Sequence, residues 1–105
     1  MAFKCEVPAM PTVQLDDNAV RITRWDFEPG AATGWHEHGW PYFVIMLTAG
    51  TLRVHDGVNV ADVALAAGQA YRRPPGIKHD VMNGSEHPIA FVEIEVKQPD
   101  ALGKA

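Results

Sequence analysis

The sequence predicts an all-β protein, folded as one small barrel or sandwich. Short apolar stretches recur along most of the chain, and they alternate or run continuously in the way that β-strands do. Gly and Pro turns such as Pro29-Gly30 and Pro74-Pro75-Gly76 separate them. Residues 61–67 could compete as a helix, but so short a segment is not stable alone. Seven to nine short strands between such turns are typical of a barrel or a sandwich.

Strands are expected at residues 20–28, 42–48, 51–55, 58–65, 79–83 and 89–97. The stretch 42–48 is a continuous apolar run, as in a buried strand, and Asp56-Gly57 is a strong hairpin signal. Within 20–28 the apolar alternation changes phase near Arg24, which predicts a bulge or a twist there.

The length of 105 residues predicts a single domain, residues 1–105, with a barrel core at about 20–97 and short extensions at both ends. Residues 99–105 are expected to form a loose tail. A net charge of −4 without a basic run predicts no nucleic-acid partner. No apolar run approaches the roughly 20 residues that span a bilayer, and the N-terminus lacks a signal peptide. Cys5, the only cysteine, cannot form an intrachain disulfide. We therefore expect a cytoplasmic protein without membrane contact.

Three of the five histidines are candidates for a metal site. His36 and His38 are two residues apart, so on a strand they project from the same face, about 6.6 Å apart along the chain. His79 follows the rigid turn ending at Gly76, and a distant strand can bring such a third ligand into a barrel. An isolated H-x-H pair is more often an ordinary polar pair than a metal site. His55 and His87, beside a hairpin turn and in a polar loop, are interpreted in that ordinary way.

The residues around these histidines resemble the two motifs of the cupin superfamily. The first, G-x5-H-x-H-x(3,4)-E-x6-G, is matched by Gly30, His36, His38 and Gly50, with Phe43 in the place of the glutamate. The second, G-x5-P-x-G-x2-H-x3-N, is matched in full by Gly68, Pro74, Gly76, His79 and Asn83. The phrases ATGWHEH, MLTAG and FVEIEVK are similar to those of very small single-domain bacterial cupins, some of them named for β-alanine degradation.

This resemblance implies a single cupin double-stranded β-helix, or jelly-roll barrel. It implies that His36, His38 and His79 hold one divalent metal ion (Fe, Zn, Ni or Mn). The fourth ligand of the family does not carry over, because Phe43 is not a carboxylate. Three neutral imidazoles would leave the full +2 charge of the ion, which favours anionic ligands. Two alternatives stay open: Phe43 fills the space of a lost metal site, or a one-residue shift brings Tyr42 to this position.

Further side chains are candidates for a substrate pocket. Arg73 could clamp a substrate carboxylate if it faces inward with Tyr71, whereas an inward Arg72 would leave Arg73 at the solvated edge. The aromatic residues Trp35, Trp40, Tyr42 and Phe43 either line the pocket or pack at the barrel mouth or a dimer face. Glu93 and Glu95 are expected to face solvent, although Glu93 is the one acid we would test as a replacement ligand.

These features favour a metal-dependent enzyme, such as a dioxygenase, that acts on a small carboxylate-bearing metabolite. The alternatives are a non-catalytic metabolite-binding or sensing barrel, and an isomerase or lyase that uses the metal as a Lewis acid. A homodimer is also expected, because the apolar edge strands of so small a barrel need cover.

Overall fold

The computed structural model describes residues 7–98, which form two β-sheets and contain no helix. The strands are β1 (Val7–Pro8), β2 (Met10–Asp16), β3 (Val20–Phe27), β4 (Ala31–Ala32), β5 (His36–Glu37), β6 (Tyr42–Met46), β7 (Gly50–His55), β8 (Val60–Leu65), β9 (Ala70–Arg73), β10 (Lys78–Asn83) and β11 (Ile89–Val96). The tail predicted at 99–105 and Cys5 lie outside the described residues.

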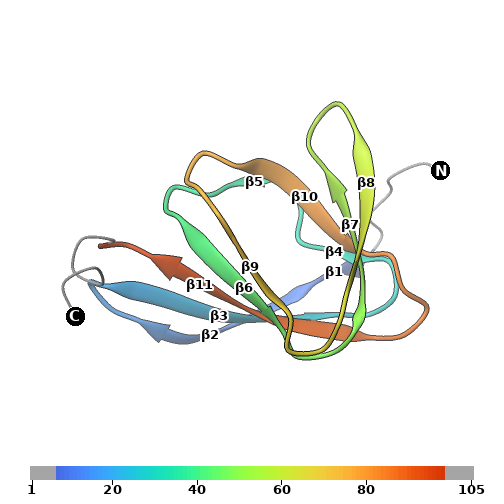
Figure 1. The fold of residues 1–105 in the computed structure, drawn as a ribbon, viewed down its shortest axis with the longest axis horizontal. Helices are drawn as coiled ribbons and strands as arrows, with labels where there is room; N and C mark the ends of the chain where they lie inside the picture. Colours follow the sequence, from blue (N-terminus) through green and yellow to red (C-terminus); the bar gives the residue numbers. More distant parts are fainter. Residues whose placement is uncertain (1–6, 99–105) are drawn as a thin grey trace.

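The two sheets have the strand orders β1-β4-β10-β7-β8 and β2-β3-β11-β6-β9, with β5 paired to β10 beside the first. All pairs are antiparallel except β1 with β4. Figure 1 shows β7 and β8 at the right, and the far ends of β2, β3 and β11 extending to the left. This all-β jelly-roll arrangement confirms the predicted fold class.

The six predicted strands coincide within two residues with β3, β6, β7, β8, β10 and β11. The strands β2 and β9 were not predicted, because their residues are almost all exposed and therefore lack the apolar signal. The two-residue strands β1 and β4 were not predicted either. The bulge or twist predicted near Arg24 does not interrupt the pairing of β3 with β11, which is in continuous register from Val20 to Phe27. The irregularity lies in the neighbouring strand instead, between Val13 and Leu15 of β2.

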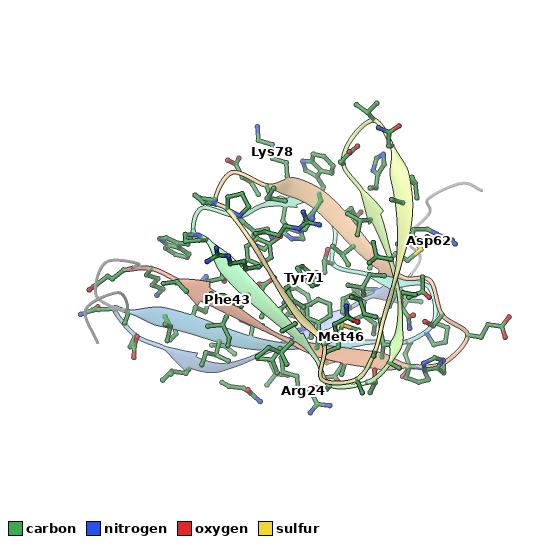
Figure 2. The ribbon with its side chains drawn as sticks, viewed as in Figure 1. Arg24, Phe43, Met46, Asp62, Tyr71 and Lys78 are labelled. Carbon is green, nitrogen blue, oxygen red and sulfur yellow. The ribbon has the colours of Figure 1, made fainter. Side chains whose placement is uncertain are left out.

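The hydrophobic core fills the space between the sheets. Its largest fully buried side chains are Phe27, Tyr42, Val44, Met46 and Leu52. Figure 2 shows Tyr71 and Met46 in the space between the two sheets. Tyr42 and Val81 belong both to this core and to the wall of the pocket described below.

Two motif residues hold the turns that frame this space. Gly50 begins β7, where an added Cβ would lie 2.5 Å from the Cγ2 atom of buried Ile89, so only glycine fits. Asn83 ends β10, and its side-chain amide donates hydrogen bonds to the carbonyls of Phe27 (3.3 Å) and His87 (2.8 Å). Asn83 therefore ties the end of β10 to two other backbone segments. None of the described residues belongs to a helix that could cross a membrane.

Candidate metal centre

The three predicted histidines come together at one point inside the barrel. His36 in β5 lies directly opposite His79 in β10. His38 follows β5 and is held by two backbone hydrogen bonds, from its own N–H to Ile77 O (2.9 Å) and from Gly76 N–H to its carbonyl (2.8 Å). The Nε2 atom of His38 lies 3.0 Å from that of His36 and 3.1 Å from that of His79.

The backbone also sets the orientation of the His36 ring. Its Nδ1 lies 2.8 Å from the carbonyl oxygen of Gly34, close enough to donate a hydrogen bond to it. This bond places the proton on Nδ1 and leaves the Nε2 lone pair directed at the other two rings. A backbone carbonyl behind a ligating histidine is a common feature of protein metal sites.

Burial keeps the other two imidazoles neutral. His38 is 4 % exposed, and burial, followed by the charges of His36 and His79, lowers its pKa to about 3. The pKa of His79 falls to about 4, mainly through burial and then through the charges of His36 and Arg73. Neutral imidazoles carry the lone pair that a metal ion requires.

The donor set fits a divalent ion. Metal–nitrogen bonds of roughly 2.1 Å allow two ligand atoms to lie no more than about 4.2 Å apart, and the distances here, 3.0 and 3.1 Å, satisfy this limit. Three lone pairs that face each other so closely also repel unless a cation or a proton lies among them. His36, His38 and His79 could therefore hold a metal ion, as the resemblance implied. Imidazole donors suit zinc, iron, nickel and copper alike, so they leave the identity of the ion open.

Tyr42, and not Phe43, occupies the position beside the histidines. The Tyr42 ring stacks on the His38 ring with centroids 3.8 Å apart and an interplanar angle of 20°. Phe43 points to the outer face of β6, 38 % exposed, opposite Ile94 and Arg72. The assignment of Phe43 to the ligand position and to the pocket is therefore wrong. Tyr42 takes the inward position instead, as in the alternative with a one-residue shift.

Glu93 was expected to face solvent, and the structure corrects this. Its side chain points inward from β11, 8 % exposed, with Oε2 3.9 Å from the Nε2 of His38. Burial, and next the charge of Glu95, raises the pKa of Glu93 to about 7, while the Trp25 indole acts slightly in the opposite direction. The half-buried Glu95 shares this inner face, and burial raises its pKa as well. No signal in the sequence indicated this, because Val92 and Ile94 make the opposite face of β11 apolar as well.

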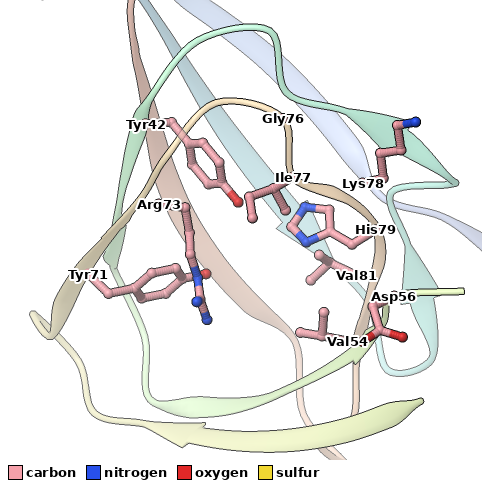
Figure 3. A pocket seen from close by; sticks show the side chains of 10 residues that line it. All are labelled: Tyr42, Val54, Asp56, Tyr71, Arg73, Gly76, Ile77, Lys78, His79 and Val81. Atoms are coloured by element: carbon pink, nitrogen blue, oxygen red, sulfur yellow. The ribbon is translucent and has the colours of Figure 1, made fainter. Parts of the chain in front are cut away.

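A cavity of about 360 Å³ opens beside the histidines. It is lined by Tyr42, Val54, Asp56, Tyr71, Arg73, Gly76, Ile77, Lys78, His79 and Val81. Figure 3 shows Tyr42 and His79 projecting into the same space, with Arg73 beside Tyr71 on another wall. The Arg73 guanidinium lies 5.7 Å from the Tyr71 ring centroid, and Arg72 pairs with outward-facing Phe43. Arg73 is thus the arginine that borders the cavity. Asp56, Lys78 and the aliphatic walls were not identified from the sequence.

Trp40, which was expected to contact substrate, does not line this cavity. Its ring packs beside two cations, Arg21 at 5.5 Å and Lys97 at 5.3 Å from the ring centroid. Trp35 is exposed and makes an edge contact with the His55 ring at 6.0 Å. Trp35 and Trp40 therefore pack against neighbouring side chains and do not line the pocket.

The lowered histidine pKa values predict a loss of stability in mild acid. Between pH 6.5 and 5 the unfolded chain protonates His38 and His79, whereas the folded chain does not, so the free energy of unfolding falls as pH falls. Glu93 acts in the opposite sense, because its raised pKa makes the folded chain bind the extra proton. The two histidines outweigh it below about pH 6. Urea unfolding of metal-free protein at a series of pH values measures this dependence.

His79→Asn should make that pH dependence shallower, because it removes one of the two buried imidazoles. His87→Asn serves as the control, since His87 is exposed on a loop. An equal slope in wild type and His79→Asn would contradict the assignment of the buried neutral histidine.

Comparisons with known proteins give three findings. The sequence profile of the family described as "Cupin domain" matches residues 23–95. The "Beta-alanine degradation protein BauB" of Pseudomonas aeruginosa is 48 % identical over 89 residues, which cover 85 % of this chain and 94 % of that protein. Among solved structures, a cupin domain from Bordetella pertussis has a TM-score of 0.84 and 41 % identity, and covers 88 % of this chain and 96 % of that one. A Klebsiella pneumoniae protein with a double-stranded beta-helix domain matches with a TM-score of 0.72 at 23 % identity, covering 91 % of this chain and 83 % of that one.

Proposed function

Because this chain belongs to the Cupin domain family, we propose that it is a metal-dependent enzyme acting on a small carboxylate-bearing metabolite. One observation carries the proposal: the Nε2 atom of His38 lies 3.0 and 3.1 Å from those of His36 and His79, and His79 lines a cavity that Arg73 also borders. Such a site joins a metal centre to a place where an anionic substrate can be held. Family membership supports the metal centre but does not define the reaction, because one fold hosts many chemistries.

Different residues have different proposed roles at this site. His36, His38 and His79 would hold the ion, and Tyr42 packs against His38 and fixes its ring. A divalent ion bound there would supply Lewis acidity toward a coordinated substrate group. Val54, Ile77 and Val81 make the intervening wall apolar, which excludes water and strengthens polar contacts within the cavity.

Arg73 is proposed to bind the substrate carboxylate, with Tyr71 and Tyr42 lining the same cavity. A guanidinium matches a carboxylate in shape and can donate two hydrogen bonds to it. The Pseudomonas relative is named for the degradation of β-alanine, itself a small carboxylate, and a cavity of about 360 Å³ suits a molecule of that size. We therefore propose β-alanine or a close derivative as the first ligand to test.

The metal assignment predicts one bound ion per chain. Protein reconstituted with Fe²⁺ or Zn²⁺ should retain close to one equivalent by elemental analysis, and His79→Ala should lose it while keeping the β-sheet circular dichroism spectrum. His87→Ala is the control, because this exposed histidine contacts the Ala49 carbonyl and belongs to neither group of candidate metal ligands. A wild-type protein without a stoichiometric ion, or a His79→Ala variant with full metal content, would overturn the proposal.

The Arg73 assignment predicts a selective loss of carboxylate binding. A charge-assisted hydrogen bond contributes about 1.5–3 kcal/mol, so Arg73→Gln should weaken β-alanine binding by roughly 10-fold or more, measured by calorimetry on the metal-loaded protein. Arg72→Gln is the matched control, because its side chain lies on the opposite face of β9. β-Alaninamide, which lacks the carboxylate, should bind equally weakly to wild type and Arg73→Gln. Equal β-alanine affinity in both arginine variants would contradict the assignment.

An oxygen electrode separates the possible reactions, since a dioxygenase consumes oxygen with its substrate and an isomerase or lyase does not. A non-catalytic sensing barrel would bind the ligand without turnover. The cytoplasmic location expected from the sequence stays a prediction, which cell fractionation tests.

The expected homodimer also stays a prediction, and β2 is the edge strand best suited to form it. All seven of its residues are exposed, among them Met10, Val13 and Leu15, and among residues 7–98 it pairs on one side only, with β3. An unpaired apolar edge invites pairing with a second copy. We expect wild type to sediment as a dimer and Val13→Lys as a monomer. A monomeric wild type, or a dimeric Val13→Lys, would exclude this interface.

A further inference from the structure

The inner face of β11 carries two acidic residues that neither sequence motif contains. Phe91, Glu93 and Glu95 alternate along this face, and Phe91 continues into the hydrophobic core. Glu93 lies between Val44 of β6 and Thr23 of β3, both buried. A carboxylate in such surroundings is costly unless a polar or charged group faces it.

The group that faces Glu93 is a candidate metal ligand. Among residues 7–98, His38 is the one basic side chain within 4.0 Å of this carboxylate, at 3.9 Å from Oε2 to Nε2. Ligand atoms of His38, Glu93 and Glu95 all lie within 4.8 Å of one another. His38 therefore belongs to two clusters, one with the other two histidines and one with the two carboxylates.

The position of Tyr42 explains why a carboxylate is needed from elsewhere. Tyr42 occupies the inner-face position beside the histidines and covers the His38 ring, and it carries no negative charge there, because burial raises the pKa of its phenol. Glu95 lies directly across from Tyr42 on the neighbouring strand β11, and Glu93 precedes it by two residues on the same face. The carboxylates of this site therefore lie on β11, one strand away from the position on β6 that Tyr42 occupies.

We propose that Glu93 is the carboxylate partner of this metal centre, a positioning residue whose charge acts on the ion from β11, on the side of the His38 Nε2 atom. This inference rests on the proposed function. A metal–nitrogen bond of roughly 2.1 Å on His38 would place the ion no more than about 6 Å from Glu93 Oε2. At that range, in a buried site, a negative charge offsets part of the +2 charge that three neutral imidazoles leave. Glu95, half-buried at the same face, adds to this field.

Glu93→Gln tests the proposal, because it removes the charge while keeping the size of the side chain. At about 6 Å and an effective dielectric constant of about 20, the loss of one carboxylate charge should lower the affinity for a divalent ion by roughly 10- to 100-fold, even after screening by solvent. We expect Zn²⁺ affinity, measured at pH 8 by competition with a chromophoric chelator, to fall by that factor. The visible absorption bands of the Co²⁺-loaded protein should shift as well, since the field at the ion changes. Glu86→Gln, on an exposed loop, is the control and should match wild type in both measurements.

The outcomes separate this inference from the proposed function. If wild type binds no ion, the metal centre itself fails, and the inference fails with it. If wild type binds one ion and Glu93→Gln matches it in affinity and Co²⁺ spectrum, the metal centre stands and the role of Glu93 is overturned. Glu93→Asp keeps the charge and should recover part of the affinity. An equal loss in Glu93→Asp and Glu93→Gln would show that packing, and not charge, is responsible, and would also overturn the proposal.

Discussion

The site depends on the pairing of β10 with a two-residue strand, β5. This pairing sets His36 opposite His79, and the two backbone hydrogen bonds between His38 and residues 76–77 hold the third ring in place. All three imidazoles therefore come from two short segments joined by main-chain bonds. The rigid turn Pro74-Pro75-Gly76 prepares the second segment, because Gly76 adopts a φ of +92° that only glycine tolerates well. Positions fixed by the backbone need little further ordering when an ion binds.

Convergence of the rings has an electrostatic cost that shapes the rest of the site. The buried rings of His38 and His79 stay neutral, so in mild acid the folded chain binds fewer protons at these rings than the unfolded chain does. Their lone pairs gain a partner only if a cation or a proton enters. The surrounding groups supply the remaining functions separately: an aromatic cover from Tyr42, a cation from Arg73 at the mouth, and a carboxylate from Glu93 in the interior. Glu93 lies beside His38, whereas the charge of Arg73 acts on His79.

The sequence predicted the features that depend on spacing along the chain. His36, His38, His79 and the glycine turns follow from fixed intervals, because turn geometry and strand alternation are local properties. The face toward which a residue points in a wholly apolar strand is not local. The run from Tyr42 to Met46 has no alternation, so only the partners on β9 and β11 decide that Tyr42 points inward and Phe43 outward. Glu93 was misplaced for a different reason: it alternates clearly with Val92 and Ile94, but here the alternation assigns the apolar side chains to the wrong face.

A charge required at a site inside a barrel need not stay on one strand. Neighbouring strands lie about 4.8 Å apart, so a side chain on the next strand reaches nearly the same point as one on the original strand. Here Tyr42 and Glu95 are direct neighbours across β6 and β11, and Glu93 lies closer to His38 from the same side. A sequence motif that follows one strand shows that its glutamate is absent, but it cannot show a carboxylate on the neighbouring strand. The charge of such a site therefore includes the acidic residues on the inner faces of the adjacent strands. In this protein they include Glu93, beside His38.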